Sequence, residues 1–545
     1  MKTPKDKEEA TGKSASSVKK ETDTTTIRPE LAEMIKRHSF GLEENRPEAA
    51  AKRQQKKQRM ARANVEDFCD SGSFIEYGAL AIAAQRGRRA EEDLISKTPA
   101  DGLIAGIGSV NGSFFKDDKA RCMVMAYDYT VLAGTQGFFN HKKMDRMLKL
   151  AYEQRLPLVL FAEGGGGRPG DVDAIGIMVA GLDLSTFGEF GKLSGRIPVV
   201  GVVSGPCFAG NAALLGCCDV IIATKNSNIG MGGPVMIEGG GLGIFKPEEI
   251  GPIDVQTQNG VVDIEVADDA EAVAAAKKYL AYFQGATPVW EAADQLRLRN
   301  LIPENSKRAY NVRTVIKALA DTDSFLELRP KFGPGMITGF MRIEGRPFGV
   351  MANNCMHMAG AIEAEGADKA ARLMQICNAH GLPIISLCDT PGFMVGPEIE
   401  KRAQVRHVCR MFVVGSHLTV PYFTVVLRRG YGLGAMAMAR GGFHESFFTA
   451  SWPTGEFGGM GIEGAIKAGF KKELAAIENP EEREKFYDML VAQLYQRGKA
   501  INMASYLEID SVIDPADTRK WIMQGIKSVP AKKHRKPGHS FIDPW

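Results

Sequence analysis

Two short turns that contain glycine are the part of the sequence best suited to chemistry. Gly210-Asn211 and Leu433-Gly434 each follow a run of apolar residues and begin an alanine-rich stretch. The first turn of a helix has backbone N–H groups without intrahelical acceptors and carries the positive end of the helix dipole. Small residues let an oxygen approach these groups, so each turn can hold a phosphate, a carboxylate or an oxyanion. Close packing of a helix on a sheet is the structural alternative for either turn alone.

Side-chain catalytic motifs are missing from the sequence. It contains no G-x-S-x-G, no H-E-x-x-H and no G-x-x-x-x-G-K-[ST], and the glycine run at residues 164–167 is followed by Arg168-Pro169. His141 and His357 are more simply explained as structural or surface residues. An enzyme with backbone oxyanion sites and no side-chain base could use a cofactor or a substrate atom as its base.

A repeated unit positions both turns. Val124-Met125-Ala126 and Val350-Met351-Ala352 are 226 residues apart, and the same offset aligns roughly forty residues without a gap. It pairs Ala133-Gly134 with Ala359-Gly360, Leu156-Pro157 with Leu382-Pro383, and Glu163 with Asp389. Matching turns in matching repeats favour a functional role over a purely architectural one.

Each repeat predicts the same order of elements. Apolar positions at helical spacing end at Leu-Pro, which predicts a helix with one buried face. A short apolar run follows, at residues 158–161 and 384–387, and a second run follows at residues 197–203 and 422–427. These runs suit buried strands, and strand–helix–strand order implies parallel pairing. The sequence therefore predicts an α/β protein with the active site where the two copies face each other.

Composition limits the classes of protein that fit. The chain has 545 residues and a formal net charge of +3, which allows two cores and argues against a general nucleic-acid binder. The apolar stretch at residues 408–427 includes Arg410, His417 and Pro421, so a buried helix–strand pair is favoured over a membrane span. Nine cysteines without a C-x-x-C argue against a zinc ribbon or a disulfide frame, so no metal site is predicted. They favour a reducing compartment, either the cytoplasm or a matrix-like one.

Three segments have a distinct composition. Residues 1–27 have no apolar core and predict a disordered tail. Residues 530–545 predict an extended basic terminus with Lys532, Lys533, Arg535 and Lys536. The basic stretch from Lys52 to Arg62 predicts a helix whose charges are either solvated or contact a phosphorylated ligand.

Several motifs in order resemble one family. Residues 389–396 (DTPGFMVG) resemble the signature turn of the carboxyltransferase subunits of biotin-dependent acyl-CoA carboxylases, of the acetyl- and propionyl-CoA carboxylase type. Residues 339–347, 204–210, 452–454 and 460–465 resemble further segments of these subunits. The resemblance covers roughly residues 30–530, and the order of the motifs in a duplicated chain makes it specific.

The resemblance implies two tandem crotonase-like (ClpP/crotonase) domains, each a parallel-sheet ββα superhelix. Residues 28–290 would form the acyl-CoA domain and residues 291–545 the carboxybiotin domain, with active sites between subunits of a homohexamer. Carboxybiotin on a carrier protein would supply CO2 for the α-carbon of an acyl-CoA. Because the chain lacks an Ala-Met-Lys-Met motif and an ATP loop, the biotin carrier and biotin carboxylase would be separate partners.

Site residues follow from the resemblance position by position. Gly210 and Asn211 would hold the thioester oxygen, and Leu433 and Gly434 the biotin oxygen. The acyl-CoA side would comprise Arg53, Lys57, Ala133, Gly134, Gly165, Gly166 and Arg168. The biotin side would comprise Gly392, Phe393, Tyr431 and Gly432. The usual Gly-Gly of the first turn is Gly210-Asn211 here, which preserves backbone donors and leaves the substrate preference open.

Other functions remain possible from the sequence. A crotonase-type hydratase or isomerase would need a carboxylate base, for which Glu163 is the best candidate, although Asp389 matches it in the second copy. A decarboxylase, a transcarboxylase and a binding protein without activity are the further alternatives.

Overall fold

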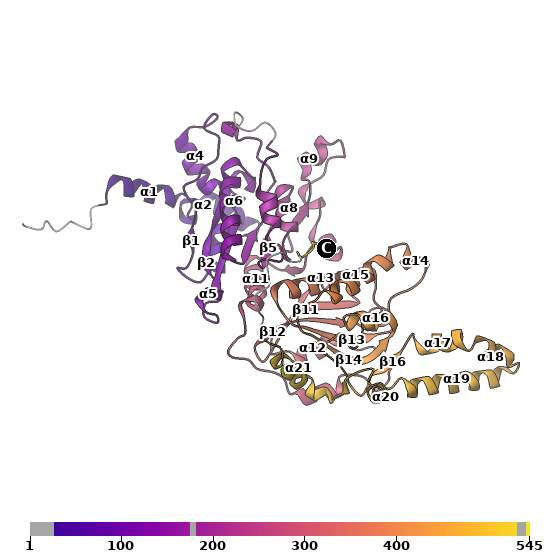
Figure 1. Cartoon of the computed structure of the whole chain (residues 1–545). Helices are drawn as coiled ribbons and strands as arrows, with labels where there is room; N and C mark the ends of the chain where they lie inside the picture. The colour runs from indigo at the N-terminus through magenta and orange to yellow at the C-terminus, as the bar shows by residue number, and fades with distance from the viewer. Residues whose placement is uncertain (1–26, 175–180, 531–540) are drawn as a thin grey trace, which may run out of the picture.

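The computed structural model describes residues 27–174, 181–530 and 541–545, and its two sheets form two halves (Figure 1). Residues 1–26 of the tail predicted at 1–27, and the basic residues Lys532, Lys533, Arg535 and Lys536, lie outside the described residues. The predicted boundary at residues 290/291 falls between the last strand of one sheet and the first strand of the other.

The first half is built on a seven-stranded sheet with two antiparallel pairs at one edge and parallel pairs beyond. Its strands in spatial order are β1 (Ile75–Glu76), β2 (Leu103–Ser109), β3 (Arg121–Tyr127), β4 (Leu158–Phe161), β5 (Val199–Val203), β7 (Val220–Thr224) and β9 (Ile264–Val266). A separate parallel pair is formed by β6 (Pro206–Phe208) and β8 (Asn228–Gly230).

The helices of this half precede, connect and follow those strands. They are α1 (Pro29–Ser39), α2 (Pro47–Gln55), α3 (Ala61–Phe68), α4 (Glu91–Lys97), α5 (Asp117–Ala120), α6 (Phe138–Gln154), α7 (Thr186–Gly191), α8 (Gly210–Gly216), α9 (Pro234–Gly239), α10 (Ile253–Gln258) and α11 (Asp269–Gln284). The helix expected from Lys52 to Arg62 is wrong in part, because α2 ends at Gln55 and Lys57 has a left-handed φ of 56°.

The second half is built on an eight-stranded sheet of the same plan. Its strands are β10 (Leu326–Leu328), β11 (Met336–Ile343), β12 (Arg346–Asn353), β13 (Ile384–Thr390), β14 (Tyr422–Tyr431), β15 (Phe448–Ser451) and β17 (Ser511–Val512), with β16 (Glu456–Gly458) paired to β14. Its helices are α12 (Val312–Leu319), α13 (Ala364–His380), α14 (Pro397–Glu400), α15 (Gln404–Ser416), α16 (Gly432–Met438), α17 (Ile462–Gly469), α18 (Lys471–Ala476), α19 (Pro480–Arg497), α20 (Ala500–Ser505) and α21 (Thr518–Lys527).

The offset of 226 residues holds in the structure. Helices α6 (138–154) and α13 (364–380) have the same length and matching ends, and β4 and β13 begin at residues 158 and 384. Left-handed φ values of Leu132 (50°) and Ala133 (55°) recur at Met358 (45°) and Ala359 (54°). Such values are uncommon without glycine, so both copies keep the same strained turn before the helix.

A buried lysine occupies the same helical position in both copies. Lys143 of α6 donates to the carbonyls of Gly78, Ala100 and Leu103, and Lys369 of α13 donates to those of Arg329 and Phe332. Burial lowers the pKa of Lys143 to about 8 and that of Lys369 to about 7. Each ammonium therefore ties its helix to the segment that leads into the first long strand of its half.

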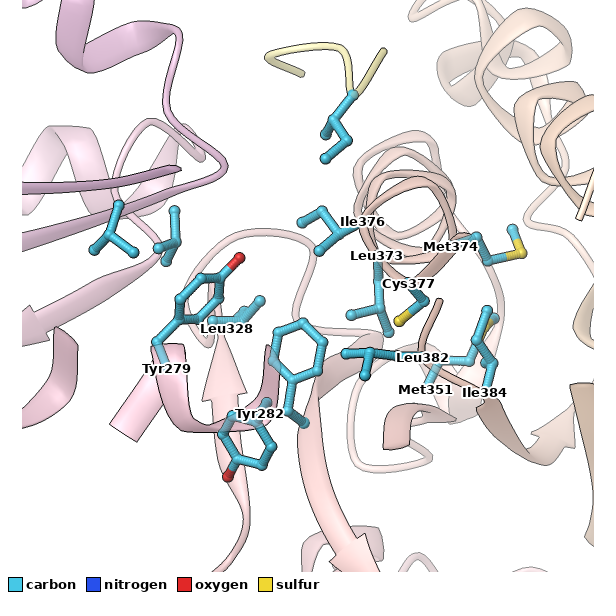
Figure 2. Packing of buried hydrophobic residues seen from close by; sticks show 14 of the residues in the cluster. Tyr279, Tyr282, Leu328, Met351, Leu373, Met374, Ile376, Cys377, Leu382 and Ile384 are labelled. Carbon is cyan, nitrogen blue, oxygen red and sulfur yellow. The ribbon is translucent and has the colours of Figure 1, made fainter. Parts of the chain in front are cut away.

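One continuous apolar core joins the halves. Tyr279 and Tyr282 of α11 pack beside Leu328, while Leu373 and Ile376 reach the same cluster from α13 (Figure 2). Side chains of the second half also bond to the first: Arg372 donates to the Asp219 carbonyl at 2.7 Å, and Arg329 pairs with Asp263 at 2.8 Å.

The apolar stretch at residues 408–427 forms the end of α15 and the start of β14, as the sequence predicts. Among the described helices, none has the length and hydropathy needed to cross a membrane.

Candidate active site

The first turn lies between β6 and α8. Its entry residue Ala209 has φ 51° and ψ −124°, a conformation that favours glycine, so the backbone is strained there. A Cβ on Gly210 would lie 2.1 Å from Oε1 of Gln136, which explains the absence of a side chain. The N–H groups of Gly210 and Asn211 are in the first helical turn, where no i−4 helical carbonyl is available.

The Asn211 side chain joins three segments around this turn. Its Oδ1 accepts from the Gly166 N–H at 3.0 Å, and its Nδ2 donates to the carbonyls of Gly134 and Glu163, both at 3.2 Å. The side chain is fully buried, so it does not line a substrate pocket. Its amide fixes the backbone and leaves the main-chain N–H as the group available to a ligand.

The second turn repeats this geometry without the amide. Gly432 has a φ of 58° and precedes Leu433 and Gly434, as Ala209 precedes Gly210 and Asn211. A Cβ on Gly434 would lie 2.6 to 2.9 Å from the backbone of Gly392 and Phe393. In this copy two backbone segments touch directly, whereas in the first copy Asn211 fills the space between them.

The structure gathers most of the predicted site residues into two groups, one in each half. Gly134, Gly166, Gly210 and Asn211 lie together around α8. Gly392, Phe393, Gly432 and Gly434 lie together around α16, with Tyr431 at the end of β14. Ala133 and Gly165 are exposed beside the first group.

Two of the predicted CoA-binding cations are committed to buried ion pairs. Arg53 pairs with Glu163 at 2.6 Å, and Arg168 pairs with Asp101 at 2.5 Å and donates to the Thr135 carbonyl at 2.8 Å. A phosphate contact by either side chain would require its ion pair to open. Lys57 is exposed and is the member of this set available to a CoA phosphate.

Glu163 is enclosed and ion-paired rather than presented to a substrate, although its raised pKa would suit a base. Burial raises its pKa to about 7, and Arg53 opposes that shift. A Cβ on Gly205 would lie 2.6 Å from its Oε1, so the carboxylate is enclosed. Its counterpart Asp389 likewise pairs with Arg428 at 3.0 Å and Arg429 at 2.7 Å, which supports an architectural role for both carboxylates.

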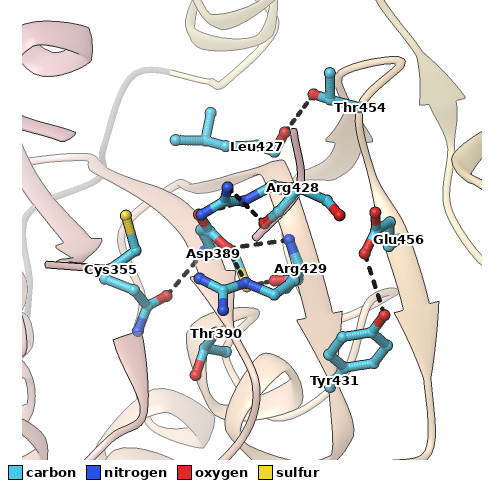
Figure 3. Close-up of polar contacts among 12 residues, drawn as sticks. Cys355, Asp389, Thr390, Leu427, Arg428, Arg429, Tyr431, Thr454 and Glu456 are labelled. Carbon is cyan, nitrogen blue, oxygen red and sulfur yellow. Dashed lines mark hydrogen bonds and ion pairs between the residues drawn. The ribbon is translucent and has the colours of Figure 1, made fainter. Parts of the chain in front are cut away.

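A polar network supports the second turn (Figure 3). The Asp389 N–H donates to Asn353 at 3.1 Å, and the Tyr431 hydroxyl donates to Glu456 at 3.3 Å. Burial raises the pKa values of both Tyr431 and Glu456. The Tyr431 ring also packs against Ile462 and Leu490 of the helical hairpin α17–α19, so the turn is coupled to that hairpin.

Sequence reasoning missed the hairpin and Glu456. The apolar spacing at 462 and 466 and the long helix α19 were available as signals, but their contact with Tyr431 depends on tertiary packing. The sequence also gives no sign of the supporting role of the Asn211 side chain, because its partners Gly134, Glu163 and Gly166 are distant in the chain.

Comparison with known proteins identifies the class. A family model described as "Carboxyl transferase domain" matches residues 52–541. The methylmalonyl-CoA carboxyltransferase 12S subunit of Propionibacterium freudenreichii subsp. shermanii is 29% identical, over 88% of this chain and 90% of its own length. The propionyl-CoA carboxylase beta chain of Saccharopolyspora erythraea is 28% identical, over 94% of this chain and 96% of its own.

Solved structures agree. A structure described as a single-chain, multi-domain long-chain acyl-CoA carboxylase superposes with a TM-score of 0.86 at 56% identity, covering 92% of this chain. The present chain spans 49% of that longer protein. A transcarboxylase 12S crystal structure, described as a hexamer assembly with methylmalonyl-CoA bound, has a TM-score of 0.80 at 26% identity and covers 95% of this chain.

The protein is therefore an α/β protein of two tandem crotonase-like units with a backbone-lined turn in each. It belongs to the carboxyl transferase family, and the resemblance noted in its sequence is confirmed.

Proposed function

We propose that this chain is the carboxyltransferase component of a biotin-dependent acyl-CoA carboxylase. It transfers a carboxyl group from carboxybiotin, held on a carrier protein, to the α-carbon of an acyl-CoA. The observation that carries the proposal is the pair of matched turns at Gly210-Asn211 and Leu433-Gly434, in a chain of this family.

The two turns divide the work. The N–H groups of Gly210 and Asn211 bind the thioester oxygen and stabilise the enolate that forms when the α-proton leaves. Those of Leu433 and Gly434 bind the ureido oxygen of biotin. Carboxybiotin supplies CO2 and the base, so the chain needs no side-chain base.

The second turn fits a group that approaches the backbone closely. Gly434 is pressed against the backbone of Gly392 and Phe393, where a Cβ would clash, and the Leu433 side chain is 60% exposed. The turn thus reaches the surface at Leu433.

The two turns lie in different sheets, which supports an active site shared between subunits. We propose that the first half of one subunit faces the second half of another within a homohexamer, with residues 28–290 and 291–545 as the two domains. A biotin carrier and a biotin carboxylase complete the complex, which we place in the cytoplasm. Absence of a metal in this subunit stays a prediction.

The alternatives differ in direction or chemistry. Decarboxylation and transcarboxylation use the same two turns and differ in the partner that receives the carboxyl group. A hydratase or isomerase would need a free carboxylate, and Glu163 is enclosed and paired with Arg53, which argues against it.

The test uses the purified chain with free biotin. Malonyl- or methylmalonyl-CoA should lose CO2 in a biotin-dependent reaction. Leu433→Pro removes one donor in the first turn of a helix, where proline is tolerated, and should lower turnover by roughly 10²-fold. Leu433→Ala keeps the donor and is the matched control. Absence of biotin-dependent turnover by the unaltered chain across carboxylated acyl-CoAs would overturn the proposal.

A further inference from the structure

A small cavity lies where the two halves of the chain meet. Its volume is about 10 Å³, which is room for one guest of the size of a water molecule or a monatomic ion. All the residues that line it are buried. Asp263 contributes from the first half, just before β9, and the rest of the lining comes from the second half. The apolar members of the lining, Leu328, Leu373 and Ile376, are labelled in Figure 2.

The polar side of the cavity carries more positive than negative charge. It comprises the cations Arg329, Lys369 and Arg372, the carboxylate of Asp263 and the hydroxyl of Thr338. Arginine keeps its charge in proteins, whereas burial lowers the pKa of Lys369 to about 7. The two guanidinium groups therefore exceed the single carboxylate by one charge even when Lys369 is neutral.

Arg372 is held by main-chain carbonyls rather than by a carboxylate. Its Nη1 donates to the Asp219 carbonyl at 2.7 Å, and its Nη2 donates to the Cys218 carbonyl at 3.2 Å. Both acceptors are neutral, and the residue is only 4% exposed. Because a buried charge is costly unless an opposite charge lies beside it, this guanidinium lacks the partner that its position demands.

Two guanidinium nitrogens of the lining have no acceptor among the described residues, namely Nη1 of Arg329 and Nε of Arg372. The Asp263 carboxylate is already engaged, since one oxygen accepts from Nε of Arg329 at 2.8 Å and the other from the Ile221 N–H at 2.7 Å. Buried donors without an acceptor are rare in folded proteins. Both orphaned donors belong to residues of the same small cavity, so one acceptor placed there would serve them together.

Charge, donors and volume together select the occupant. A water molecule would accept hydrogen bonds but would leave the excess charge uncompensated. Carboxylate, phosphate and sulfate groups contain several heavy atoms and do not fit a space of about 10 Å³. A chloride ion is monatomic, only accepts hydrogen bonds and carries the one negative charge that the cavity lacks.

We propose that this cavity is a chloride site, in which the guanidinium groups of Arg329 and Arg372 hold the ion. Both arginines belong to the second half and also bond to the first, Arg372 to the segment before β7 and Arg329 to Asp263. The ion neutralises them at this contact and so fastens α13 to the first half. Chloride therefore stabilises the folded chain, in a role independent of carboxyl transfer.

Arg342 supplies a matched control for Arg372. It is also buried, and it donates to the carbonyls of Ala281, Gly285 and Gly345. In the part of the chain that the structure describes, none of its nitrogens is buried without an acceptor, and it does not line this cavity. Arg342→Met thus removes a buried arginine from main-chain acceptors, as Arg372→Met does, and leaves the proposed site intact.

The site can be tested in two ways on the full chain. In crystals soaked in sodium bromide, anomalous scattering should locate a bromide in the cavity, because bromide replaces chloride. In solution, urea unfolding is measured as sodium chloride replaces sodium gluconate at constant ionic strength, since gluconate is too large for the cavity. Above the dissociation constant, each tenfold rise in chloride should lower the equilibrium constant for unfolding about tenfold.

Arg372→Met should abolish this chloride dependence, whereas Arg342→Met should keep it, although both variants lose stability. The same dependence in all three proteins would be a general salt effect and would overturn the proposal. A cavity that holds an ordered water and no bromide would overturn it too, even if Arg372→Met does not fold. Bromide in the crystal without a chloride dependence in solution would show an adventitious ion only, and the proposal would again fail.

Discussion

The Asn211 amide offers the sharpest test of how the first turn is held. Asn211→Ala removes three hydrogen bonds and leaves the Gly166 N–H and the carbonyls of Gly134 and Glu163 without this partner. Each orphaned buried group costs about 1 to 3 kcal/mol, and the carbonyls can relax more easily than the N–H. The expected loss of stability is therefore about 3 to 5 kcal/mol, a large part of the ~5 to 15 kcal/mol typical of a folded domain.

The measurement should be local as well as global. Urea unfolding gives the change in stability, and hydrogen exchange of the peptide that contains Gly166 reports whether its N–H has lost its acceptor. Asn211→Asp is the informative companion, since it keeps an acceptor for Gly166 and places an oxygen against two carbonyls; it should be at least as destabilised. A change below about 0.5 kcal/mol in Asn211→Ala, with unaltered exchange at Gly166, would refute the reasoning.

Four further outcomes follow from the contacts of the two turns. Folding raises the pKa of Glu163 from 4.5 to about 7, so its contribution to stability is present below pH 4.5 and is lost as the pH rises through 7. Glu163→Gln should therefore reduce the change in unfolding free energy between pH 5 and pH 8 by on the order of 3 kcal/mol, measured by urea unfolding. Arg53→Met leaves the Glu163 carboxylate buried without its partner and should lower the unfolding free energy by about 3 to 5 kcal/mol at pH 8. The double variant with Glu163→Gln should recover much of this loss, and additive losses would contradict the pairing. The Cβ of Gly434→Ala should clash with the facing backbone and lower the rate of biotin-dependent decarboxylation, measured while the protein is still folded. Full activity would show that the turn can accept a Cβ. Tyr431→Phe removes the bond to Glu456 and should cost about 1 kcal/mol, measured by urea unfolding, and a loss above 3 kcal/mol would mean that the hydroxyl has further partners.

Much of the fold could be predicted because the same pattern of apolar residues occurs in both copies of the repeat. The helix before Leu-Pro and the short strand after it recur at residues 138–161 and 364–387, and both copies of the repeat match that expectation. The turns could also be predicted, because glycine is the residue that most readily adopts a positive φ.

The partners of charged side chains could not be predicted. Arg53 is part of a basic stretch that resembles a phosphate contact, yet it is buried against Glu163, 110 residues away. Sequence spacing carries no information about which cation a distant carboxylate will meet. A cavity beside Leu433 could not be predicted for a similar reason, because its walls come from helices α16, α17, α19 and α20 and from strands β14 and β16, which only tertiary packing brings together.

The matched lysines in α6 and α13 can report how fast each half of the protein opens. Lys143 and Lys369 have lowered pKa values, so a substantial share of each amine is neutral and reactive near pH 8, but burial keeps reagents away. An amine-reactive label would therefore mark each lysine only when its own half opens. Mass spectrometry of the two labelled peptides would time the opening of the first half and of the second half separately, in one sample.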